Sequence, residues 1–544
     1  MKFCHILIYI VLLFSLNTVA SAESLMTRYQ LPPLERIVLT QDEQGRAAKL
    51  LLDKARVLQR AQQVSIPFTQ IEDPTTYTEK LRTEIQAHLP VPTNSQPTVF
   101  KGDKASKLNQ LLQSLPAPRY LIVQAPTIQL DEFLKIPSDT TLSGRNAELV
   151  TETSLDSAAV VIVGNNIVLK DFTVKTSGLG IQVSAAQNVI LRNLHFSKVA
   201  RGIAIENNSH FIELDQVVIT DSKAGMSIQQ DVSHVWLHHS VIRNSLRADN
   251  GGAGLLVSDA KPREKLEEST NSSALTETIY PPAPAPHALL IENNEFSHNV
   301  AQGVYFDGVY GSVLRANQIS DNDKEGICLD FGSANNILME NSFINNGRRA
   351  RQSDQDLTDD LVMNFGRLAD GSAVSKLPGI ALDNAAQNLI LWNTIRDNSG
   401  DGIKIVRTGI RNLFLFNTII SNSQGNNSKL HFFGILLGSA GLEPNVDPAN
   451  HPLDFLPPLE NIVAGNSIYG KHWSAILLDH EAAFNDIYDN IAHHFTHTTL
   501  EQATQRHNSI VGNSWQPQPA PPAKPLWRTW RACLRGLVYW WECL

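Results

Sequence analysis

Three aspartates stand at the same place in successive repeats of this chain. Asp307, Asp330 and Asp383 each follow a glycine by four residues, and the stretch between the last two holds one repeat and an insertion. If each repeat is one winding of a solenoid, the three carboxylates form a column with a spacing of about 4.8 Å. Carboxylates at that spacing repel each other unless one is protonated or a cation is shared. The column therefore predicts either a divalent-cation site, with Ca²⁺ the best guess for oxygen ligands, or neighbouring carboxyls that act as acid and base.

Basic residues follow the acidic column. Lys404 is the second residue after the next glycine of the repeat, where the preceding copy has Ala381, and Arg407 lies at the end of that strand. The candidate catalytic residues are Lys404, Arg407, Asp330 and Asp383. Carboxyls about 5 Å apart suit a retaining glycosidase and those about 6.5–9.5 Å apart an inverting one. Adjacent windings give the first spacing and windings one apart give about the second, so the sequence permits both.

The candidate residues for substrate binding are Tyr305, Asp307, Arg348, Arg367 and His431. The two arginines belong to an insertion rich in Arg and Asp, whose charges would clamp an anionic sugar or would simply belong to a solvated surface loop. His431 lies near the mouth of the groove described below. The candidate metal ligands are the three aspartates of the column.

The element that must position these residues is a short repeat. An apolar-x-apolar-x-Asn element ends at Asn317, Asn341, Asn393 and Asn417, and consecutive copies without an insertion are 23 or 24 residues apart. A recurrence of that length indicates a solenoid, and alternation with period two indicates strands. At about 3.3 Å per residue, one period makes a coil of three short strands. We predict a parallel β-helix of about eleven coils over residues 119–515.

Asparagine has a mechanism in such a turn. It tolerates a left-handed conformation, and its side chain can hydrogen-bond to the backbone of the neighbouring coil, which predicts a ladder. Asp215 and His239 are assigned to the same place in two early copies, so a structural role is favoured for His239 over a catalytic one. A second column is expected at Asn299, Asn322, Asn346, Asn398 and Asn422.

Residues after each glycine alternate between the two faces of their strand. The first and third should point inward and the second and fourth toward solvent. Four insertions, at about 259–287, 347–378, 421–433 and 439–459, begin or end beside the glycine strand. Loops on both edges of one sheet predict a groove with the aspartates on its floor, whereas the corner with the ladder stays bare.

The flanks indicate an exported, capped rod. Residues 1–22 read as a signal peptide, with an apolar run and a small-residue cleavage site, and no later stretch has the length of a membrane span. Residues 23–118 are expected to be a mainly helical N-terminal cap region, with helices at about 35–63 and 108–115. Residues 516–526 are a Pro-rich linker. The Trp- and Arg-rich tail, 527–544, is either a cap over the last coil or an interfacial membrane helix.

Composition excludes some classes of protein. The formal net charge is −9 and no basic stripe is interleaved with aromatics, which argues against a nucleic-acid partner. Four cysteines, one of them in the signal peptide, provide neither a disulfide framework nor a zinc-like spacing.

The repeats and their asparagine ladder resemble those of the pectin-lyase-like superfamily over about three quarters of the chain. The resemblance implies a right-handed parallel β-helix and, among its enzymes, uronate lyases, polygalacturonase-like hydrolases and alginate C5-epimerases. The aspartate column with Lys404 and Arg407 is most similar to the lyase pattern, in which Asp or Glu hold Ca²⁺ and a basic residue abstracts a proton. The paired Asp-Asp and His-Gly motifs of the hydrolases have no match on neighbouring coils, and the Asp-Pro-His-Asp signature of the epimerases is absent.

Two classes of function are consistent with these residues. One is an exported enzyme, periplasmic, secreted or on the cell surface, that cleaves or modifies an acidic polysaccharide. The other is a non-catalytic carbohydrate-binding or surface protein with a structural ion site. Either would be a monomer or a homotrimer, with membrane contact only through the C-terminal tail.

Overall fold

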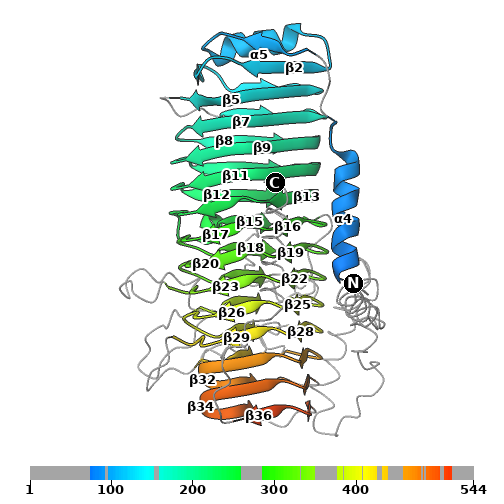
Figure 1. The fold of residues 1–544 in the computed structure, drawn as a ribbon, viewed down its shortest axis with the longest axis vertical. Coiled ribbons are helices and arrows are strands. Elements are labelled where there is room, and N and C mark those ends of the chain that lie inside the picture. The colour runs from blue at the N-terminus through cyan, green and yellow to red at the C-terminus, as the bar shows by residue number, and fades with distance from the viewer. Residues whose placement is uncertain are drawn as a thin grey trace, which may run out of the picture.

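The computed structural model describes residues 74–91, 96–151, 158–258, 285–330, 332–348, 377–383, 385–406, 409–424, 432–438, 458–478, 482, 485–502 and 508–516. The expected signal peptide, the helix at about 35–63, the linker, the tail and most of each long insertion lie outside these residues. The described strands wind into a rod, and each winding pairs in parallel with the next (Figure 1). None of the described helices has the length and apolar character needed to cross a membrane.

The rod has three faces, which we name by their strands. The Gly sheet contains the strands that follow the repeated glycines, and it runs through β4 (Leu134–Ile136), β6 (Val160–Ile162), β8 (Leu179–Ser184), β10 (Arg201–Glu206), β12 (Ala224–Gln229), β15 (Leu255–Ser258), β18 (Val304–Asp307), β21 (Ile327–Asp330), β24 (Ile380–Asp383), β27 (Ile403–Val406), β30 (Ile435–Leu437), β32 (Ser467–Leu478) and β34 (Ile491–Gln502). The strands make about 13 turns, so the expectation of about eleven coils was too low.

The ladder sheet contains the strands that lead to the asparagine turn. It runs through β1 (Thr98–Phe100), β2 (Arg119–Val123), β5 (Thr140–Val150), β7 (Ile167–Lys175), β9 (Gln187–Ser197), β11 (His210–Thr220), β13 (Ser233–His238), β16 (Leu290–Glu292), β19 (Val313–Arg315), β22 (Ile337–Met339), β25 (Leu389–Leu391), β28 (Leu413–Leu415), β31 (Ile462–Ala464), β33 (Asp486–Tyr488) and β35 (Ser509–Val511).

The third sheet lies between the asparagine turn and the next glycine. It contains β3 (Thr127–Gln129), the second halves of β5, β7, β9 and β11, then β14 (Val241–Arg243), β17 (Glu295–Ser297), β20 (Gln318–Ser320), β23 (Ser342–Ile344), β26 (Thr394–Arg396), β29 (Thr418–Ile420), the first halves of β32 and β34, and β36 (Ser514–Gln516).

The core fills the inside of the rod. In the Gly sheet the first and third residues after each glycine are fully buried in it, as at Ile327 and Leu329 or Ile403 and Ile405. Inward apolar side chains from all three sheets join one continuous cluster. The period-two alternation therefore predicted correctly which side chains enter the interior.

The ladder is confirmed, with one change in its mechanism. The Asn393 side chain, for example, donates to Asn417 Oδ1 at 3.0 Å and to Leu338 O at 2.8 Å. The left-handed residue of the turn is the one before each ladder asparagine, as at Trp392 with φ 54° and Gly465 with φ 64°. The asparagine therefore serves through its side-chain amide and not through its backbone conformation.

The early copies of the ladder were assigned too early in the chain, by two residues at Asp215 and by one at His239. Strand pairing aligns Asp215 with His238, and His239 has a φ of 49°, so it occupies the left-handed position. The ladder position of that winding is Ser240, whose backbone N–H donates to Asn294 Oδ1 at 2.9 Å. His239 therefore does not replace an asparagine of the ladder. Its position in the turn no longer favours a structural role over a catalytic or ligand role.

Two further asparagine columns line the other turns. The expected second column is confirmed, because Asn299 Nδ2 donates to Asn322 Oδ1 at 2.8 Å and the bonding continues through Asn346, Asn398 and Asn422. A third column, not expected from the sequence, runs through Asn336, Asn388, Asn412, Asn461, Asn485 and Asn508. Each column satisfies backbone groups that would otherwise be buried without partners.

Two α-helices among the described residues flank the rod. Helix α5 (Ala105–Ser114) matches the helix expected at 108–115, and its Leu108 and Leu112 join the core at the N-terminal end. Helix α4 (Pro74–His88) lies along the side of the rod and not at its end (Figure 1). It packs on the outer face of β11, β13 and β16. The outer face of the ladder sheet, next to the corner that was expected to stay bare, is therefore covered by a helix.

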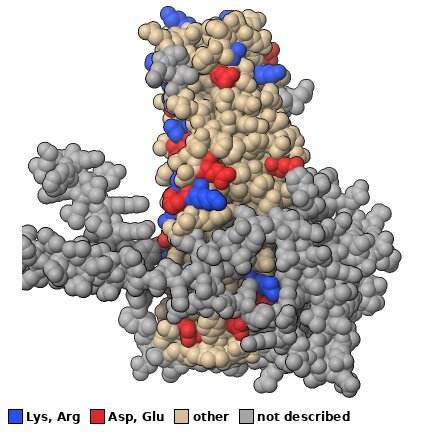
Figure 2. Space-filling view, turned by 90° about the vertical axis from the view of Figure 1, so that its right-hand side faces the viewer, with Lys and Arg blue, Asp and Glu red and all other residues tan. Residues whose placement is uncertain are grey.

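Helix α4 is held by both apolar and polar contacts. Its Leu81 and Ile85 are buried in a cluster with Trp236, and Arg82 makes bonds of 3.1 and 2.7 Å with the two oxygens of Glu292. Burial of each large apolar side chain contributes about 1.5–3 kcal/mol. On the face shown in Figure 2, described charged side chains are scattered among uncharged ones, and acidic and basic residues adjoin without forming a broad basic patch there.

Candidate active site

The aspartate column lies on one sheet as the spacing predicts. Asp307 pairs in register with Asp330. Leu329 pairs with Leu382, which places the following residues, Asp330 and Asp383, side by side. Because their neighbours Leu329 and Leu382 point into the core, the aspartates leave the strands on the outer face.

The expectation that these side chains face solvent was wrong for most of the column. Asp330 is 8% exposed and Asp383 3%, whereas Asp307 is half-buried. Tyr305, Cys328 and Ala381, at the other outward position, form a second buried cluster outside the core together with Ala253. Outward side chains at strand spacing cover each other's flanks, so the outer face carries a packed layer of its own.

Tyr305 connects this layer to the acidic column. Its hydroxyl donates a hydrogen bond of 2.8 Å to Asp330 Oδ2. Burial, and then the negative charges of Asp330 and Asp307, raise the pKa of Tyr305 well above its usual value. Burial and the nearby carboxylates likewise raise the pKa of the Cys328 thiol. Both groups therefore keep their protons at neutral pH.

Two buried carboxyls of this face were missed in the sequence. Glu325 and Asp401 each stand directly before a repeated glycine, and they are 6% and 3% exposed. Burial raises the pKa of Glu325, an effect that the Lys324 and Lys404 charges oppose. Burial also raises the pKa of Asp401 to about 6, against the Lys404 charge and a hydrogen bond of 2.6 Å from the Phe433 N–H. Their recurrence before the glycine was the signal that could have identified them.

Lys404 borders the acidic groups as predicted. It pairs in register with Ala381, is half-buried, and acts electrostatically on both Glu325 and Asp401. Farther along the face, Lys324 Nζ and Gln302 Nε2 both donate to Asn250 Oδ1 at 3.1 Å, in the 3₁₀ helix η3 (Asn250–Gly252). The face therefore combines buried carboxyls, a phenol and two ammonium groups, and such perturbed groups are concentrated at functional sites.

Three of the predicted residues cannot be placed against this face. Arg407, Arg367 and His431 lie outside the described residues. Arg348 is exposed and its guanidinium lies 3.7 Å from Asp321 Oδ1, just beyond β20 of the third sheet. That contact places Arg348 at a different corner from the aspartate column. The walls of the expected groove also lie outside the described residues.

Two family models match parts of the chain. Residues 162–361 match a family described as periplasmic copper-binding protein (NosD), and residues 285–446 match one described as right handed beta helix region. The chain is a right-handed parallel β-helix. The expected fold class, including its handedness, is thus confirmed. No curated protein matches the chain.

Solved structures of similar fold include several enzymes. The A-module of mannuronan C-5 epimerase AlgE4 from Azotobacter vinelandii has 12% identity and a TM-score of 0.47, over 79% of this chain and 99% of that one. The periplasmic alginate epimerase AlgG has 12% identity and a TM-score of 0.34, over 75% and 84%. DFA-IIIase from Arthrobacter chlorophenolicus A6, without its lid, has 10% identity and a TM-score of 0.41, over 79% and 97%. Similarity at this level carries no conclusion about activity.

Proposed function

We propose that this chain is an exported carbohydrate-active enzyme that acts on an acidic polysaccharide at the outer face of the Gly sheet, by β-elimination. The observation that carries the proposal is the set of groups on that face: the aspartate column, the Tyr305–Asp330 hydrogen bond, and Lys404 on the strand next to that of Asp383. Buried ionisable groups are costly, and a sheet that only had to fold would not need them on its outer face.

Exposure divides the roles within the set. Asp307 and Lys404 are half-buried and keep some accessible surface, so they are the groups that contact the sugar. Tyr305, Asp330 and Asp401 are buried and act by holding charge and hydrogen bonds in place. This division limits the predicted catalytic set to Lys404 among the described residues, with Glu325 and Asp401 as the buried carboxyls on which its charge acts.

The proposed reaction follows from the chemistry of uronates. Lys404 takes the proton next to the sugar carboxylate, and the released electron pair forms a carbon–carbon double bond. The glycosidic carbon–oxygen bond at the next carbon breaks, and the leaving oxygen takes a proton from water. Positioned proton transfer of this kind contributes about 10²–10⁴-fold to a rate. Re-protonation of the sugar from the other side would give an epimerase in place of a lyase.

Calcium binding at Asp307, Asp330 and Asp383 is part of the proposal. The three carboxylates and the Ser258 hydroxyl, which bonds to Asp307 Oδ2 at 3.3 Å, are oxygen donors of the kind that Ca²⁺ takes. One bound Ca²⁺ would supply positive charge that stabilises the carbanion formed beside the sugar carboxylate and would offset the carboxylates around Lys404.

The decisive experiment is turnover of a panel of uronate polymers, with and without Ca²⁺. Absorbance of unsaturated uronate, reducing ends and sugar composition separate lyase, hydrolase and epimerase. Lys404→Met should lower the rate at least about 100-fold, because it removes the proton acceptor. Its matched control is Lys135→Met, because Lys135 occupies the same outward column at the exposed N-terminal end of the Gly sheet.

A second pair of variants tests the acidic column. Asp330→Asn should reduce turnover, whereas Glu206→Gln should not, although strand pairing places Glu206 in the same column four strands away. Equal activity of all four variants and the native protein would show that the active site does not lie on the outer face of the Gly sheet. Absence of turnover on every polymer, combined with polymer binding, would favour the non-catalytic alternative.

Copper binding is a second candidate function. The family matched by residues 162–361 is described as periplasmic and copper-binding, which also supports export to the periplasm. The observation that favours it is a pair of adjacent histidines, His238 and His239, inside the matched range. Cu²⁺ is bound well by imidazole.

A further inference from the structure

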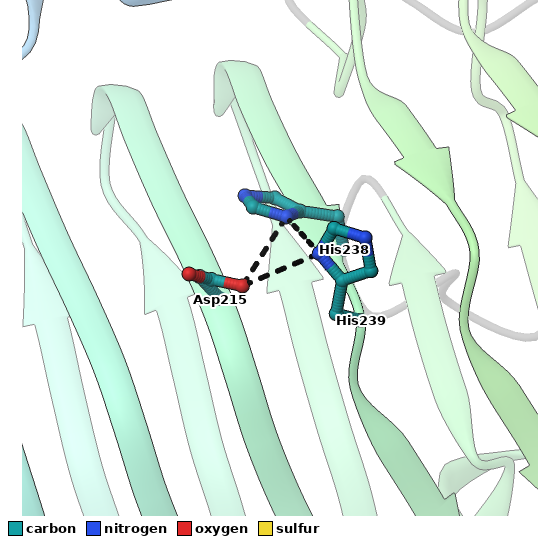
Figure 3. A group of neighbouring side chains, drawn as sticks. All are labelled: Asp215, His238 and His239. Atoms are coloured by element: carbon teal, nitrogen blue, oxygen red, sulfur yellow. Dashed lines mark hydrogen bonds and ion pairs between the residues drawn. The ribbon is translucent and has the colours of Figure 1, made fainter. Parts of the chain in front are cut away.

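A second group of polar side chains lies on the ladder sheet. Asp215 ends its part of β11 on the outer face, His238 is its register partner on β13, and His239 follows in the turn. Figure 3 shows the three side chains directed toward one another. One ligand atom from each lies within 4.8 Å of the others. The aspartate column is on the Gly sheet, so the two groups are separate.

The three distances define a small triangle. His238 Nδ1 and His239 Nδ1 are 2.9 Å apart, and Asp215 Oδ1 is 3.3 Å from the first and 3.4 Å from the second. Two ligands at about 2.0–2.1 Å from one ion are about 2.9 Å apart at a right angle and about 3.3–3.4 Å apart at the tetrahedral angle. We propose that Asp215 Oδ1, His238 Nδ1 and His239 Nδ1 form a binding site for one transition-metal ion.

Neighbouring residues prepare these atoms as ligands. Glu213 Oε1 lies 3.2 Å from His238 Nε2, so Nε2–H donates to it and the lone pair is left on Nδ1. A carboxylate behind a histidine in this way is the usual partner of a metal-binding imidazole. Trp236 stacks on the His238 ring at 4.0 Å and fixes its plane.

The two oxygens of the Asp215 carboxylate have different neighbours. Arg192 Nε lies 3.0 Å from Oδ2, whereas Oδ1 faces the two imidazoles. Within the described part of the chain, Oδ1 is buried and has no hydrogen bond of good geometry. A buried carboxylate oxygen without a hydrogen bond is costly, and a cation would remove that cost.

The donor set defines the class of ion. Two imidazole nitrogens and one carboxylate oxygen suit Zn²⁺ or Cu²⁺, whereas Ca²⁺ and Mg²⁺ take oxygen ligands. Side-chain exposure is 6% for His238 and 59% for His239, so the site opens on the His239 side. Three protein ligands leave a position for water or for a donor from another molecule. The site does not depend on the proposed polysaccharide activity, and it deepens the copper-binding candidate by assigning the ligand atoms from their geometry.

The test is titration of the full, untagged exported chain with Zn²⁺ and with Cu²⁺ against a competing chelator. We expect one tight equivalent, and His239→Asn should raise its Kd by more than about tenfold. Asparagine suits this substitution because it accepts positive φ and stands at the matching left-handed position as Asn293. His195→Asn is the matched control, because it removes an exposed imidazole from the neighbouring β9. The control should bind like the native protein.

A second measurement keeps the proposal decidable if a variant does not fold. Anomalous diffraction from crystals soaked in Zn²⁺ should place a peak between the three side chains. Equal Kd values for the two variants, no tight binding, or a peak only elsewhere would overturn the proposal and leave a polar cluster that binds no metal ion. Loss of this site with polysaccharide turnover intact would leave the proposed enzyme untouched.

Discussion

Asp401 provides a quantitative test of the electrostatics on the Gly sheet. The substitution Asp401→Asn keeps the shape and the oxygen that accepts the Phe433 N–H, but it removes the ionisable group. Burial raises the pKa of this carboxyl from its usual value of 3.8 to about 6. A carboxyl whose pKa is raised on folding contributes most favourably to stability when the pH is below its pKa in the unfolded state. That contribution is lost as the pH rises through its pKa in the folded state.

The magnitude follows from the shift. A displacement from 3.8 to about 6 at about 1.36 kcal/mol per unit corresponds to a penalty of about 3 kcal/mol in the native protein above pH 6, and none below pH 4. The variant carries no such penalty. Its free energy of unfolding, relative to that of the native protein, should therefore rise by up to about 3 kcal/mol between pH 4 and pH 8, mostly between 4 and 6.

The assay is urea unfolding of both proteins at one-unit steps of pH, followed by tryptophan fluorescence. Contributions from every other group cancel in the difference between the two proteins. Asp397→Asn is a control from the same winding, because Asp397 is partly exposed and has a φ of 59° that asparagine accepts. A difference that stays flat from pH 4 to 8, or one that falls as pH rises, would refute the assignment of Asp401 as a buried acid that titrates near pH 6.

Two other predictions concern the asparagine ladder and the outer face of the Gly sheet. Asn393→Ala removes four hydrogen bonds: the side chain donates to Leu338 O and Asn417 Oδ1, and its oxygen accepts from the backbone N–H and the side-chain amide of Asn341. Urea unfolding should therefore show that the free energy of unfolding falls by about 4 kcal/mol. Asn513→Ala, at the half-buried end of the ladder, should lower it clearly less. Equal losses of stability would contradict the expectation that hydrogen bonds in the buried part of the ladder contribute more than those at its end. Cys328 is 7% exposed and the pKa of its thiol is raised, so iodoacetamide should modify it in urea but not in the folded protein. Rapid labelling of the folded protein would show that the outer face of the Gly sheet is open to solvent.

The fold could be predicted because a solenoid is a local structure. Each winding contacts mainly its neighbours, so a period of 23 or 24 residues fixes the register of distant segments. This is why Asp307 and Asp330 could be placed side by side from spacing alone. The same reasoning failed by one residue in the early windings, where Asp215 was aligned with His239 in place of His238, because those copies lack the asparagine that marks the register.

Burial and contacts between elements could not be read from the repeat. Alternation correctly sent Asp330 and Asp383 outward, but it could not show that the outer face would be packed. The position of α4 along the ladder sheet also depends on contacts with β11, β13 and β16, which have no counterpart in the period.

The sequence by itself determined the coil, its three short strands and the side of the strand on which each aspartate emerges, because these depend on spacing along the chain. The tertiary structure alone decided which polar atoms meet. Glu213 and Asp215 lie 3.2 and 3.3 Å from the two ring nitrogens of His238 on the next winding, because backbone pairing holds the two strands in register. Side-chain directions and desolvation, which set the pKa of Asp401 and the triangle of ligand atoms, exist only once the windings have stacked.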